Sequence, residues 1–149
     1  MAAAHEDERV AAAAQAARAL PFPFTLTARA EGLLGGRTSL DEVIARLQAF
    51  EKAGADVLMA PGLPDLGAVR AVCAALAKPF NFMAGIRGKS FTVAELEAAG
   101  VRRISLASSL YRAAMTGMLD AAREVRDKGT FDYLDRAVSL PDWITLIKA

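Results

Sequence analysis

Two arginines in this chain follow short runs of residues that predict β-strands, and both could bind an anion. Arg29 ends the run 24–29, and Arg112 lies a few residues after the run 103–107. A guanidinium offers a planar fork of N–H donors that matches a carboxylate or a phosphonate. Each arginine also has an ordinary alternative. Arg29 could pair with Glu31 or another surface acid, and Arg112 could lie exposed on the first turn of a helix.

The sequence has few of the residues that other kinds of catalytic centre need. The chain has one histidine and one cysteine, which argues against a histidine-based triad and against a multi-histidine or cysteine-rich metal site. Cys73 shares a predicted helix face with Val69 and Leu76, so we expect it to be a packing residue. The segment 85–90 ends like a phosphate-binding loop, but Met83 stands where that motif needs its first glycine.

The composition favours a soluble globular domain. Of the 149 residues 54% are apolar and 23% are charged, which is enough to build a packed core and too apolar for a disordered chain. Eighteen basic residues balance seventeen acidic ones, so the net charge of +1 favours neither a nucleic acid nor an anionic membrane as partner. No apolar segment reaches the roughly 20 residues of a membrane span, and the acidic start lacks the apolar region of a secretory signal. We therefore expect a cytoplasmic protein.

Strand-like and helix-like segments alternate along the chain. An alanine-rich helix is predicted over residues 6–20, and the later helices begin at two capping boxes, Ser39 with Glu42 and Thr92 with Glu95, or precede a glycine. The four predicted strands are residues 24–29, 56–60, 79–83 and 103–107. They begin about 33, 23 and 23 residues apart, and such a βα repeat predicts a parallel sheet with right-handed crossovers.

Five short stretches resemble, in order and spacing, the second half of the isocitrate lyase/phosphoenolpyruvate mutase superfamily. They are Thr27-Ala28-Arg29, Leu40-Asp41-Glu42, Ala53-Gly54-Ala55-Asp56, Pro61-Gly62-Leu63 and Gly100-Val101-Arg102-Arg103-Ile104-Ser105. The resemblance runs from about residue 9 to residue 137. It implies an α/β fold: four βα units of a (β/α)8 barrel, equivalent to strands five to eight. A complete barrel takes about 250 residues, so residues 1–149 are expected to form one partial domain, a half barrel of parallel strands with a C-terminal helical tail.

The resemblance also implies roles for single residues. Arg29 would hold a carboxylate or phosphonate of the substrate, and Arg112 has the context of an arginine that contacts the same anion in the lyase branch. Asn81 would lie in the third strand, either as a ligand-binding residue or in a structural hydrogen bond inside the barrel. Pro61 stands near the place where the lyases have a glutamate, which argues against isocitrate and methylisocitrate as substrates.

The function implied is the C-terminal part of a magnesium-dependent lyase or mutase. Such an enzyme would break or form a C–C or P–C bond of a small 2-oxo acid or related carboxylate or phosphonate through an enolate. In the family the Mg²⁺ ligands and the gating loop lie in the first half of the barrel, and their motifs do not occur in these 149 residues. The alternative is therefore a half-barrel scaffold or assembly module without turnover.

A half barrel exposes its strand edges and one sheet face, so it needs a partner. We expect either a homo-oligomer or pairing with a missing N-terminal half. The helical tail, residues 130–149, would dock on the barrel or on a neighbouring subunit through Trp143, Ile144 and Ile147.

Overall fold

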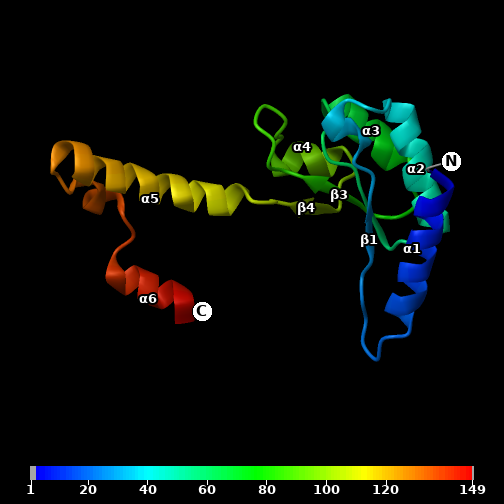
Figure 1. The fold of residues 1–149 in the computed structure, drawn as a ribbon, viewed down its shortest axis with the longest axis horizontal. Coiled ribbons are helices and arrows are strands. Elements are labelled where there is room, and N and C mark those ends of the chain that lie inside the picture. The colour runs from blue at the N-terminus through cyan, green and yellow to red at the C-terminus, as the bar shows by residue number, and fades with distance from the viewer. Residues whose placement is uncertain (1–2, 149) are drawn as a thin grey trace. The chain divides into compact units, whose positions relative to one another are not determined.

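A computed structural model describes residues 3–148 and shows an α/β chain whose strands form one sheet (Figure 1). The strands are β1 (Thr27–Arg29), β2 (Val57–Met59), β3 (Phe80–Met83) and β4 (Arg103–Ser105). The α-helices are α1 (Ala3–Arg18), α2 (Leu40–Lys52), α3 (Leu66–Ala75), α4 (Val93–Ala98), α5 (Ser109–Lys128) and α6 (Leu140–Lys148). Two 3₁₀ turns accompany them, η1 (Gly32–Gly35) and η2 (Asp132–Arg136). The chain divides into two compact units between Ala107 and Ser108.

The sheet confirms the predicted βα repeat. Its order is β1-β2-β3-β4, every neighbouring pair is parallel, and a helix lies in each connection between consecutive strands. The first strand begins at Thr27, three residues later than the sequence predicts. The reason is a long-range contact: the carboxylate of Asp56 accepts the backbone N–H of Leu26 at 2.8 Å, and the side chain of Phe24 is exposed.

One face of the sheet is covered by helices. Because side chains alternate along a strand, Ala28, Leu58 and Phe82 point to the same face, where they join a single apolar cluster. The helices contribute a matching stripe to this cluster: Val43, Leu47 and Phe50 from α2, Val69 and Val72 from α3, and Leu96 from α4. The core of the first unit therefore lies between the helices and this face, and it leaves the opposite face of the sheet to other uses.

Both predicted capping boxes are present. The Ser39 hydroxyl accepts the backbone N–H of Glu42 at 3.2 Å, and the Glu42 carboxylate accepts the backbone N–H of Ser39 at 2.7 Å. Thr92 and Glu95 repeat the arrangement at the start of α4. These reciprocal bonds satisfy N–H groups that the first turn of a helix leaves unpaired.

Replacing Ser39 with alanine is expected to lower the free energy of unfolding by about 1 kcal/mol, because the backbone N–H of Glu42 loses its acceptor. The hydrogen bond from the Ser39 backbone holds the pKa of Glu42 below its ordinary value of 4.5. The stabilising contribution of the Glu42 carboxylate is therefore complete above pH 4.5 and is lost as the pH falls through the lowered pKa. Urea unfolding at pH 7 and at pH 3 checks both points. The second point is tested with Glu42→Gln, because the Ser39 backbone N–H that Glu42 accepts remains in Ser39→Ala. A Glu42→Gln penalty of the same size at both pH values would contradict it.

In the second unit, the described residues 108–148 form helices and the short connections between them. Helix α5 is followed by Gly129, whose φ of 69° is the left-handed conformation that favours glycine at a helix end. Two helical pieces follow, η2 and α6, and Pro141 lies in the first turn of α6. A proline is well tolerated there because that N–H has no partner in the helix. Trp143 and Ile147 are both exposed. Within residues 3–148 no helix is long and apolar enough to cross a membrane.

Candidate functional site

The face of the sheet turned away from the helices carries a row of four residues, one from each strand. Strand register places Arg29 beside Met59, Met59 beside Asn81, and Asn81 beside Arg103. A hollow of about 310 Å³ lies over this row. Its walls are formed by Thr27, Arg29, Met59, Asn81, Arg103 and Ser105. This is a volume that a small organic anion can occupy, at the lower end of the range for ligand sites.

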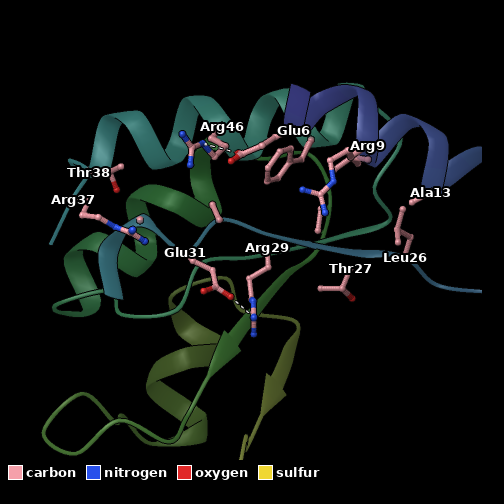
Figure 2. Close-up of a pocket in the computed structure, with 15 residues that line it drawn as sticks. Glu6, Arg9, Ala13, Leu26, Thr27, Arg29, Glu31, Arg37, Thr38 and Arg46 are labelled. Carbon is pink, nitrogen blue, oxygen red and sulfur yellow. Dashed lines mark ion pairs between the residues drawn. The ribbon is translucent and has the colours of Figure 1, made fainter. Parts of the chain in front are cut away.

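Arg29 is the last residue of β1, and its side chain is 52% exposed. Its guanidinium forms an ion pair with the carboxylate of Glu31, two residues along the chain (Figure 2). The alternative that the sequence left open for Arg29 is therefore present. The same contact shows that the guanidinium can receive a carboxylate at this position. An exposed pair of this kind contributes only about 0–1 kcal/mol, so a ligand carboxylate can displace Glu31 at little cost.

Asn81 is held in place by Ser105. Its Nδ2 donates to the Ser105 Oγ at 2.9 Å, and the Ser105 hydroxyl donates back to Oδ1 at 3.1 Å. With only 2% of its surface exposed, Asn81 is buried, yet it lines the hollow. The structural hydrogen bond that the sequence offered as an alternative is therefore present. The Asn81–Ser105 pair therefore fixes an amide and a hydroxyl in the hollow that Arg29 and Arg103 also line.

Arg112 lies on the first turn of α5, in the second unit. Its backbone N–H donates to the carbonyl of Ser108, its carbonyl accepts the hydroxyl of Thr116, and its side chain is exposed. Because Arg112 and the sheet belong to different compact units, the structure brings Arg29 and Asn81 together but leaves the role of Arg112 a prediction.

Sequence reasoning missed Arg103. The run 103–107 was interpreted only as a strand, whereas Arg103 contributes a second guanidinium to the hollow and donates from Nη1 to the Thr27 Oγ1 at 3.4 Å. Alternation along β4 could have found it, since Arg103 and Ser105 must share a face. This alternation points to a site only when the strand register is known, because the register places Arg103 beside Asn81.

The segment 85–90 forms a loop after β3 and does not continue into a helix, as a phosphate-binding loop would. The Lys89 ammonium donates to the carbonyl of Gly62 at 3.3 Å, which ties this loop to the turn after β2. Arg87 is exposed beside it. Arg87 and Lys89 both follow the end of β3. The ammonium of Lys89 is used to connect this loop to the turn after β2.

A second hollow, of about 600 Å³, runs along β1 beneath α1 and α2 (Figure 2). It contains Arg9 and Arg37, together with Arg46, whose Nε lies 3.4 Å from the Glu6 Oε2. In the part of the chain that the structure describes, β1 pairs with β2 alone, so this hollow flanks an open strand edge. Open edges of this kind are places where another segment can add a strand.

Comparisons with known proteins decide the family. The sequence model described as phosphoenolpyruvate phosphomutase matches residues 1–126. The chain belongs to this family. The resemblance given by the five motifs is thereby confirmed, and so is the α/β fold of parallel βα units.

Several solved structures of phosphoenolpyruvate phosphomutase relatives match the chain. A protein of Burkholderia cenocepacia J2315 described as a lyase/mutase has 49% identity and a TM-score of 0.90, over 97% of this chain and 52% of that one. A 2,3-dimethylmalate lyase has 27% identity and a TM-score of 0.75, over 86% and 46% of the two chains. An oxaloacetate acetylhydrolase, solved with its product oxalate, has 27% identity and a TM-score of 0.77, over 87% and 45%. The chain spans about half the length of these structures, and no curated protein matches it.

The hollow over the sheet does not fit the Mg²⁺ that this family implies, because none of its six lining residues has a carboxylate. Between residues 3 and 148, no three histidine, cysteine, aspartate or glutamate side chains come together. The residues that line the hollow provide guanidinium, amide and hydroxyl groups, which are able to hydrogen-bond to an anion.

Replacing Glu31 with glutamine is expected to strengthen anion binding by about two- to fivefold, because the carboxylate that competes for the Arg29 guanidinium is removed. Titration of the intact protein with oxalate, by calorimetry, measures the change. Glu97→Gln, at an exposed position of α4, removes the same charge away from the hollow and serves as the control. Equal affinities in the wild type and in Glu31→Gln would show that Glu31 does not compete with the ligand.

Proposed function

We propose that this chain is the C-terminal, anion-binding part of a lyase- or mutase-type enzyme that acts on a small carboxylate or phosphonate. The observation that carries the proposal is the Arg29 guanidinium, which already holds a carboxylate and lines both the hollow over the sheet and the hollow along β1. Support also comes from the family, whose members similar to this chain include a 2,3-dimethylmalate lyase and an oxaloacetate acetylhydrolase.

In this proposal Arg29 binds one anionic group of the substrate through two parallel N–H···O bonds and sets its orientation. The Asn81 amide and the Ser105 hydroxyl, already fixed by each other, border the substrate on the neighbouring strands. Arg112, in the first turn of α5, would bind the same anion through its guanidinium when α5 lies against the site. Holding the anion in this way aligns the C–C or P–C bond that breaks to leave an enolate, and alignment alone can contribute several kcal/mol to catalysis.

The proposal includes a barrel whose other half comes from elsewhere. The four strands would be equivalent to strands five to eight, and the open edges of β1 and β4 would pair with an N-terminal half or with a second copy of the chain. The helical tail, residues 130–149, would dock on the barrel or on a neighbouring subunit through the exposed side chains of Trp143, Ile144 and Ile147. We also propose that the protein is cytoplasmic and that its substrate is a small carboxylate or phosphonate.

The test is an assay of the intact protein that carries this chain, with Mg²⁺, against oxaloacetate, 2,3-dimethylmalate and phosphonopyruvate. Turnover of one of them that oxalate inhibits would support the proposal. Size-exclusion chromatography with light scattering gives the assembly state of the same sample. A stable assembly that turns over none of the three and does not bind oxalate would instead support the scaffold alternative.

A further inference from the structure

The open face of the sheet is concave, and one hydrogen bond shows it. Arg103 on β4 reaches Thr27 on β1, although two strands lie between them. Three strand spacings are about 14 Å in a flat sheet, which is farther than these two side chains can bridge. The sheet must therefore curve, and its curvature turns side chains of the outer strands β1 and β4 toward the same hollow.

Two guanidinium groups line that hollow, but only one of them has an acidic partner. Arg29 is paired with Glu31. Among residues 3–148 no carboxylate lies within ion-pair distance of Arg103, whose recorded contact is a long hydrogen bond to a neutral hydroxyl. None of the six residues that line the hollow is acidic. Arg103 therefore offers donors and a positive charge that this part of the protein does not use.

We propose that Arg103 is a second ligand-binding arginine, which binds one anionic group of a two-anion ligand while Arg29 binds the other. The argument rests on the strand register: Arg29 and Arg103 lie in one row across the sheet, separated by Met59 and Asn81. The ligand class is a small molecule with two anionic groups, such as a dicarboxylate or a phosphonate that also has a carboxylate. The inference deepens the proposed function and rests on it for the role of Arg29.

The polar groups between the arginines suit such a ligand. The Thr27 hydroxyl, now the acceptor for Arg103, and the Asn81–Ser105 pair provide neutral hydrogen-bonding groups along the hollow. A monoanion would satisfy one guanidinium only and leave the other without a charge partner. The site is therefore expected to prefer dianions over monoanions of the same length.

Calorimetric titration of the intact protein with succinate and with butyrate tests this preference, because the two probes have four carbons each and differ by one carboxylate. The wild type is expected to bind succinate at least about tenfold more tightly than butyrate. Arg103→Met should weaken succinate binding and bring the succinate-to-butyrate ratio close to one. The affinity for butyrate should change little. Arg103→Lys keeps the charge but loses the fork, so it should retain part of the preference.

Arg102→Met is the matched control. Arg102 does not line the hollow. Its charge acts instead on Cys73 of α3: burial raises the pKa of the Cys73 thiol, and Arg102 opposes that rise in part. This variant removes the same net charge and should leave the succinate-to-butyrate ratio unchanged.

The results separate this inference from the proposed function. The inference is overturned if the wild-type ratio is near one, or if Arg103→Met has the same ratio as the wild type. A lower melting temperature of Arg103→Met would not rescue it, because it would show only that Arg103 makes a contact within the protein. Turnover that depends on Arg29 would leave the proposed function standing in that case. Dianion preference that depends on Arg103, without turnover of any substrate, would refute the proposed function alone.

Discussion

Replacing Arg29 with alanine in the intact protein is expected to lower kcat/KM by about 100- to 1000-fold. The change removes the guanidinium that would hold one anionic group of the substrate, and losing a single well-placed donor to an anion typically has an effect of that size. The Arg29 side chain is half exposed and stabilises little beyond its pair with Glu31, so folding should be unaffected. Steady-state kinetics with the best substrate of the assay described above measures the loss.

Two further variants make the Arg29 result specific. Arg29→Lys keeps the positive charge but loses the planar fork, so it should recover only part of the lost activity. Arg70→Ala removes an exposed arginine from α3 and should leave kcat/KM within about twofold of the wild type. An Arg29→Ala protein with wild-type kcat/KM would show that Arg29 serves only its surface ion pair.

Leu47→Ala is expected to lower the free energy of unfolding by about 3–5 kcal/mol. Leu47 is fully buried on α2 and belongs to the cluster between the helices and the sheet. Removing its branched end leaves a cavity that the neighbouring side chains fill only in part. Since a typical domain is stable by about 5–15 kcal/mol, this one change removes a large part of the stability that holds the row of site residues in place.

Urea unfolding of the intact protein, followed by circular dichroism, measures the effect of Leu47→Ala. Val93→Ala on α4 is the control, because the Val93 side chain is exposed and its loss should change the free energy by less than about 0.5 kcal/mol. Similar midpoints for both variants would mean that α2 does not contribute to the core as the structure indicates.

The parts of the fold that depend on local pattern were predictable. The strand spacing gave four parallel strands in order, and Ser39 and Thr92 marked the starts of α2 and α4 because capping boxes act within four residues. The start of β1 was not predictable in this way. It depends on the Asp56 carboxylate, which takes the N–H of Leu26 from 30 residues away.

The site was predictable only in part, for a similar reason. Arg29 could be chosen because it ends a strand, and both of its alternatives could be stated in advance. The role proposed for Arg103 depends on strand register and on the curvature that brings it to Thr27, and neither is visible in a single strand. The buried Asn81–Ser105 pair likewise joins two strands 24 residues apart.

The most direct test of the account is a crystal structure of the intact protein with oxalate bound. The account predicts that one oxalate carboxylate lies on the Arg29 guanidinium over the hollow of the sheet, with Glu31 displaced from it. Oxalate bound elsewhere in an active protein, with the Arg29–Glu31 pair intact, would contradict the account.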